Sequence, residues 1–193
     1  MKKVDRSELL DLGAYEQIRE RFRDRVIGLK KNRRAKLGDH MSLVFENHDT
    51  MLLQVQEMLR TERITDEKAI AHELATYNEL IPEAGKLSAT HFIEYDDADE
   101  RRRMLARFHD LRDQIHLRIG DKRITASFYV HHGEELDRIP AVNYLTFDVG
   151  RQHAATLRDG DIPAALEVTH PDYQVSLDLS PGMREALAHD LDS

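Results

Sequence analysis

Cysteine is absent from this chain of 193 residues, and so are long apolar runs. Without cysteine the protein can form no disulfide, and it has no thiolate for a zinc ion, an iron–sulfur cluster or a nucleophilic mechanism. The longest apolar runs span only a few residues, such as 51–53, whereas a membrane-spanning helix needs about 20. We therefore expect no membrane association. The lack of cysteine suits a reducing compartment such as the cytoplasm.

Several functional signatures are also missing. Asp5 and Glu8 interrupt the segment that would have to be the apolar core of a signal peptide, so no secretion is expected. The patterns GxxxxGK[ST], GxGxxG and GxSxG do not occur, which leaves nucleotide-cradling loops and a nucleophile elbow without support. The sequence thus has no decipherable catalytic signature, and it leaves open whether the protein is an enzyme.

Charge is unevenly distributed along the chain. The net charge is −8, yet residues 19–36 hold nine basic and two acidic residues, a net charge of +7, which leaves −15 for the remainder. Near the end of this segment lie five candidate cations for binding an anion or a partner: Lys30, Lys31, Arg33, Arg34 and Lys36. They either complement a helix dipole or form a patch for phosphate groups or an acidic protein. The negative net charge and the lack of interleaved aromatic residues argue against nucleic acid as a partner.

Apolar spacing predicts an α+β fold. Helices are expected over 14–36, 51–63 and 66–80, with a short strand at 41–46 and Gly38 as a helix cap. A strand over 87–95, a helix over 97–113, a hairpin over 115–130, a strand over 142–149, a hairpin over 167–179 and a last helix from Ser180-Pro181 should follow. We predict a single domain, 1–193, with a helical portion at 1–85 and a mostly antiparallel sheet with packed helices at 86–193.

The first predicted helix has a stripe of core residues, namely Tyr15, Ile18, Phe22, Val26 and Leu29. Their spacing of three and four residues places them on one face. Arg33 continues the same line. The helix must therefore leave the core after Leu29, or Arg33 must meet an acidic group.

Three stretches carry a resemblance to a known family: LGDHMSLVFENHDTMLLQVQEMLRTERI, ELATYNELIP and LSATHFIEYDDADERRRMLARF. They resemble the bacterial domain-of-unknown-function 3501 family over nearly the whole chain. That family has no established activity, and the resemblance implies only a context, in which the genes commonly lie beside those for a rubrerythrin-like protein and an iron–sulfur oxidoreductase. His48 stands where the family often has Arg, and Asn143 where it often has His.

The block 38–60 concentrates the polar residues of this resemblance, so we predict that it forms the functional surface. The candidates are Asp39, His40, Glu46, Gln56, Glu57 and Arg60, with Asp49 as a helix N-cap. His40, Glu46 and Glu57 form the best candidate metal set, because carboxylates with one imidazole suit iron or manganese. Asp39 could instead orient His40 as a general base. Solvated or ion-paired roles remain open for all of them.

Eleven histidines invite a wider metal hypothesis, but their spacing does not support one. The chain has no His-x-His, HExxH or His-x-x-x-His. Glu-x-x-His occurs once, at Glu167 to His170 in a predicted strand, whereas di-iron sites carry it on bundled helices. His131 and His132 are adjacent and fit a loop.

These patterns support three functional hypotheses. The first is a non-catalytic accessory or interaction protein in an iron-linked redox or peroxide-defence system. Its partners would be the rubrerythrin-like protein and iron–sulfur oxidoreductase that the resemblance implies, or a second copy in a homo-oligomer. The second is a small non-thiolate metalloenzyme with iron or manganese. The third is a phosphoanion-binding module, which would need Arg33, Arg34 and Arg60 to converge.

Overall fold

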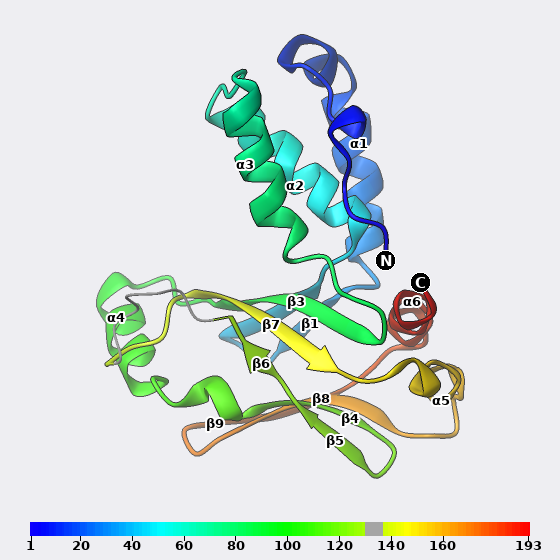
Figure 1. Ribbon diagram of the computed structural model, residues 1–193. Helices are drawn as coiled ribbons and strands as arrows, with labels where there is room; N and C mark the ends of the chain where they lie inside the picture. Colours follow the sequence, from blue (N-terminus) through cyan, green and yellow to red (C-terminus); the bar gives the residue numbers. More distant parts are fainter. Residues whose placement is uncertain (130–136) are drawn as a thin grey trace.

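Two antiparallel sheets form the β part of the computed structural model, which describes residues 1–129 and 137–193 (Figure 1). The five-stranded sheet has the order β1 (Arg34–Leu37), β2 (Met41–Phe45), β3 (Lys86–Ile93), β7 (Val142–Asp148) and β6 (Ser127–Phe128). The four-stranded sheet has the order β5 (Lys122–Thr125), β4 (Ile115–Ile119), β8 (Ala164–His170) and β9 (Tyr173–Asp178). β1 and β2 precede residue 85 and β3 and β7 follow it, so one sheet unites both predicted portions.

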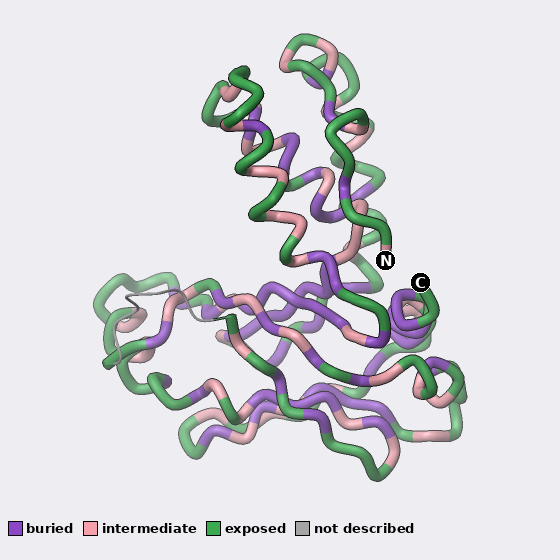
Figure 2. Tube along the Cα trace, in the orientation of Figure 1, coloured by how far each residue is buried: buried purple, intermediate pink, exposed green. Residues whose placement is uncertain are grey.

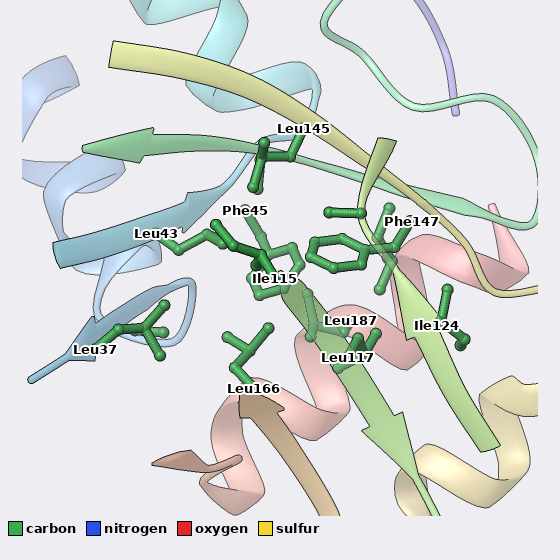
Figure 3. Packing of buried hydrophobic residues seen from close by; sticks show 14 of the residues in the cluster. Leu37, Leu43, Phe45, Ile115, Leu117, Ile124, Leu145, Phe147, Leu166 and Leu187 are labelled. Carbon is green, nitrogen blue, oxygen red and sulfur yellow. The ribbon is translucent and has the colours of Figure 1, made fainter. Parts of the chain in front are cut away.

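The main hydrophobic core lies between the two sheets. Alternation along the strands sends every second side chain inward, as the pattern of β7 shows, where Asn143, Leu145 and Phe147 are buried. Figure 3 shows Phe45 and Leu43 from one sheet close to Ile115, Leu117 and Leu166 from the other. Leu187 joins them from α6 (Pro181–Asp192).

Three helices stand on the opposite face of the five-stranded sheet: α1 (Leu12–Lys30), α2 (His48–Thr61) and α3 (Glu67–Asn78) (Figure 1). Together with the N-terminal segment and η1 (Arg6–Glu8) they enclose a second, smaller core of Val4, Leu9, Met51, Val55, Leu59, Ile70 and Ile81. Figure 2 shows this layer buried along its inner faces and exposed at its far tips.

The remaining helices lie at the margins of the sheets. They are α4 (Ala98–Arg107), η2 (Leu111–Asp113), η3 (Arg151–His153), α5 (Ala154–Arg158) and α6. In Figure 1, α4 lies at one end of the sheets, and α5 and α6 at the other. The guanidinium of Arg184 in α6 donates to the backbone carbonyls of Leu157, Asp159 and Ile162, which holds α5 against α6.

The predicted α+β class is confirmed, and several local signals lie where the sequence places them. Two hairpins turn at residues 120–121 and 171–172. Asp66 and Asp97 cap α3 and α4, and Ser180 caps α6 with Pro181 in its first turn. The sequence patterns did not predict the short helix α5, which lies between η3 and β8.

The first helix is shorter than predicted, which is a correction. It ends at Lys30, and Arg34–Leu37 forms β1 instead, with Ala35 and Leu37 buried while Arg34 and Lys36 are exposed. β1 pairs with β2 through a turn in which Gly38 has a φ of +69°, so this glycine closes a hairpin and does not cap a helix. Backbone pairing with β2 outweighs the helical tendency of a basic run.

Other expectations about the helices also need correction. Asn47 caps α2, which begins at His48, whereas Asp49 forms an ion pair with Arg25. The helix predicted over 97–113 ends at Arg107, and η2 follows. In the stripe of the first helix, Tyr15 and Val26 are buried, but Ile18 and Leu29 are exposed. His131 and His132 lie outside the described residues.

Candidate functional site

His40 and Asp39 lie in the turn between β1 and β2. The His40 ring stacks on Tyr95 with centroids 4.0 Å apart, and its Nδ1 is 3.2 Å from the Glu94 carbonyl oxygen. Its backbone N–H donates to the Tyr173 hydroxyl, which in turn donates to the Leu37 carbonyl. These contacts give His40 a structural role in holding the turn.

Glu57, Gln56 and Arg60 connect α2 to α1 and its preceding segment. Glu57 accepts hydrogen bonds from the Tyr15 hydroxyl at 2.7 Å and from Arg19 Nε at 2.8 Å, and the Arg19 bond holds the pKa of its carboxyl below the usual range. Arg60 pairs with Glu16 at 2.7 Å. Gln56 exchanges hydrogen bonds with both backbone groups of one residue, Leu10. All three predicted site residues thus have partners within the helical layer.

The predicted metal set is therefore not brought together. His40 and Glu46 flank the two ends of β2, so they are separated by about 20 Å of extended chain, and Glu57 is bound to α1. Within 1–129 and 137–193, no group of three His, Asp or Glu side chains could hold a metal ion. Arg33, Arg34 and Arg60 do not converge either, since Arg33 binds Asp190 and Arg60 binds Glu16.

The basic run forms a surface at the junction of α1 and β1, but with one member fewer than predicted. Arg33 is only 5% exposed and forms a bidentate ion pair with Asp190, at 2.6 and 2.8 Å. The other four cations surround a shallow depression of about 510 Å³ next to the exposed Ile27. We call Lys30, Lys31, Arg34 and Lys36 the basic surface. Across the described part of the chain, none of the four has an acidic partner.

A second hollow lies between the helical layer and the five-stranded sheet. This sheet–helix cavity has a volume of about 170 Å³. Lys30 and Arg34 line it as well as the depression, so the cavity and the basic surface are continuous. The other lining residues come from β2, β3, β7, α2, α3 and their ends: Val44, Glu46, Met51, Gln54, Tyr77, Leu80, Thr90, Phe92, Val142 and Tyr144.

Glu46 is the charged group buried in this cavity, with 5% of its surface exposed. It directly follows β2, and its backbone N–H donates to the Ser88 carbonyl at 2.8 Å, which continues the pairing with β3. One carboxylate oxygen, Oε1, accepts from the Thr90 hydroxyl at 2.6 Å. The other, Oε2, is buried and has no hydrogen-bond partner among the residues described.

Two phenols share the cavity with Glu46. Tyr144 lies directly opposite Thr90 in the β3–β7 pairing, and Tyr77 comes from the last turn of α3. Burial raises the pKa of the Tyr144 hydroxyl, and the nearby Tyr77 and the Glu46 carboxylate raise it further. The Tyr144 hydroxyl therefore stays protonated and can donate a hydrogen bond at neutral pH.

Comparison with known proteins identifies the family. The profile of the family described as "Protein of unknown function (DUF3501)" matches residues 3–191. The chain belongs to the DUF3501 family. A crystal structure of a novel protein of unknown function from Burkholderia pseudomallei K96243 is 35% identical in sequence and has a TM-score of 0.90, over 99% of this chain and 100% of that one. No curated protein matches the chain.

The two positions that the resemblance singled out, His48 and Asn143, each have a local partner in the structure. His48 begins α2, and its Nε2 lies 3.0 Å from a carboxylate oxygen of Glu8. Asn143 lies opposite His91 in the β3–β7 pairing and donates to the Pro140 carbonyl. Glu167 and His170 have separate partners, Arg118 and Asp110, and do not form a joint site.

Sequence reasoning selected Glu46, Lys30 and Arg34 but missed the residues that surround them. Thr90, Tyr77 and Tyr144 lie far along the chain, on three other elements. One signal was available, because a glutamate ends the otherwise apolar run MSLVFE, where a buried charge would need a partner. Its partner could not be named before the strand pairing was known.

Proposed function

We propose that this DUF3501 protein is a non-catalytic accessory or interaction protein that binds an acidic partner through the basic surface. The supporting observation is that four neighbouring cations, in a protein rich in ion pairs, have no acidic partner within the described residues. Clustered charges of one sign repel each other, and a surface of opposite charge relieves that repulsion.

The chemistry of the surface favours a protein over a nucleic acid. The net charge of −8 would repel a polyphosphate chain, whereas it does not prevent docking of a local acidic patch. The first partners to test are the rubrerythrin-like protein and the iron–sulfur oxidoreductase that the family context suggests, in an iron-linked redox or peroxide-defence system. A second copy of this acidic chain is another candidate. Within the described residues, no helix is long and apolar enough to cross a membrane.

The metalloenzyme and phosphoanion hypotheses gain no support from the geometry. His40, Glu46 and Glu57 lie apart, and two of the three arginines that should converge are held by carboxylates. The basic surface remains the better basis for a function.

Charge reversal tests the proposal. The variant Lys31→Glu/Lys36→Glu changes two exposed residues outside the sheet–helix cavity, and its matched control, Lys68→Glu/Arg103→Glu, makes the same change of net charge on α3 and α4. We would measure association with both redox proteins, and self-association, at low and high salt. The first variant should slow association about tenfold and reduce its salt dependence, while the control should not. Equal binding by both variants would remove the basic surface as the binding site.

A further inference from the structure

Arg34 and Glu46 are neighbours of opposite charge that do not pair with each other. In the β1–β2 pairing Arg34 lies directly opposite Val44, and Glu46 is two residues further along the same face. Such diagonal neighbours lie about 7–8 Å apart, within reach of an arginine side chain. Instead, the Arg34 guanidinium lies 5.9 Å from the centre of the Phe92 ring, and Glu46 binds Thr90. Both charged side chains line the sheet–helix cavity.

The buried end of this cavity presents an acceptor that needs a donor. Glu46 Oε2 is buried and without a hydrogen-bond partner in the described part of the chain, and such a carboxylate is costly unless a cation or an N–H group meets it. Tyr77 and Tyr144 line the same space. Aromatic rings at a binding site favour an ammonium group, which would also bind the carboxylate.

The same cavity also presents donors that need an anion. Lys30 and Arg34 line it, and neither has an acidic partner among residues 1–129 and 137–193. Arginine in particular suits a carboxylate, because its guanidinium can donate two parallel hydrogen bonds. Val44, Met51, Leu80 and Val142 add apolar lining to the cavity.

We propose that the sheet–helix cavity binds a small α-amino acid, with its ammonium group on Glu46 and its carboxylate on Arg34 and Lys30. A zwitterion gives Glu46 and the two cations a partner of opposite charge at the same time. The volume of about 170 Å³ is below the range of drug-sized pockets and fits a small metabolite. The apolar wall favours an aliphatic side chain. Lys30 and Arg34 belong to both proposals, whereas Glu46 belongs only to this one. The Glu46→Gln variant therefore tests this inference without changing the basic surface.

The test compares one amino acid with two analogues, one lacking the carboxylate and one lacking the ammonium group. The standard L-amino acids are screened at millimolar concentration for an increase in melting temperature, because a ligand that binds only the native state raises it. Calorimetry then compares L-leucine, or the best amino acid of the screen, with its decarboxylated amine and its deaminated acid. We expect the amino acid to bind at least about tenfold more tightly than either. No increase with any amino acid, or equal binding of the amine alone, would overturn the proposal.

Three glutamine variants locate the site. Glu46→Gln and Arg34→Gln each remove one charge from the cavity, and both should weaken amino-acid binding by at least about tenfold. Lys36→Gln is the control, because Lys36 belongs to the basic surface but does not line the cavity. The affinity of this variant for the amino acid should stay unchanged. Should Glu46→Gln fail to fold, the exposed Arg34 still gives an independent result. Undiminished binding in Arg34→Gln would place the amino acid elsewhere.

Discussion

Arg33 and Asp190 form a buried ion pair across 157 positions of sequence. The two side chains are 6% and 2% exposed, and two hydrogen bonds of 2.6 and 2.8 Å join them. The pair connects the segment between α1 and β1 to α6, so it holds the start of the five-stranded sheet against the last helix. Arg33 belongs to the basic run in sequence, but in the structure it is part of the interior.

The first prediction concerns this pair. Replacing Asp190 by Asn, or Arg33 by Glu, leaves a buried charge uncompensated, which should reduce the free energy of unfolding by about 3–5 kcal/mol. Lys36→Glu, three residues further on, changes an exposed side chain that does not line the sheet–helix cavity, and it should have little effect on stability. Urea unfolding of the three variants measures the difference. Equal stability of Arg33→Glu and Lys36→Glu would show that the ion pair does not support the fold.

The second prediction concerns the start of α2. The Asn47 side chain accepts from the Thr50 backbone N–H at 3.0 Å, and the Thr50 hydroxyl accepts from the Asn47 N–H at 2.9 Å. Asn47→Ala should therefore cost about 1 kcal/mol. Asp49→Ala removes only a partly exposed pair with Arg25 and should cost less. Thermal unfolding of both variants gives the comparison, and a larger loss for Asp49→Ala would reassign the cap.

The third prediction compares two glycines at which an added Cβ should have opposite effects on stability. At Gly38, with a φ of +69°, a Cβ would lie 2.5 Å from the Tyr173 hydroxyl oxygen, so Gly38→Ala should destabilise the protein by about 1–3 kcal/mol. Gly28 lies within α1 with open space around the same position, so Gly28→Ala should stabilise the protein by about 0.5–1 kcal/mol. Melting temperatures that shift in the same direction would contradict this account.

The parts of the fold that sequence predicts are those with local causes. The hairpin turning at Gly120-Asp121 combines strand alternation with a turn signal, and the caps Asp66 and Asp97 act within their own first turns. β1 differs because its four residues, Arg34–Leu37, continue a basic helical run. They form a strand only because β2 supplies their hydrogen-bond partners, and local periodicity does not contain that information.

Only the charged residues of the candidate site could be predicted from the sequence. Glu46 and Arg34 stand out in the sequence, but the sheet register decides that Thr90 reaches one and that Phe92 lies beneath the other. Glu57 also stands out in the sequence, but in the structure it is already paired with Arg19. No pattern near Glu57 in the sequence predicts that contact. Long-range packing alone decides which polar residues remain unpaired.

The last prediction concerns His91, which lies in the core on β3. It is fully buried, both ring nitrogens lack a hydrogen-bond partner among the described residues, and the Phe128 ring meets it edge-on. Burial lowers the pKa of its imidazole from 6.5 to about 4. The ring is therefore neutral in the native state at neutral pH.

Stability should consequently fall as the solution becomes mildly acidic. Between pH 6.5 and 4 the unfolded chain binds a proton at His91 that the native state excludes, so the free energy of unfolding decreases as pH falls. The contribution is about 2 kcal/mol between pH 6.5 and 5, a window above the usual range for carboxyl titration. His91→Leu should lose this contribution, whereas a control variant of the exposed His72, His72→Gln, should keep it. Urea unfolding of the three proteins at several pH values measures the slopes. A wild-type slope that survives in His91→Leu would assign the acid sensitivity to other groups, of which His116 and His153, whose pKa values are also lowered by burial, are the next to test.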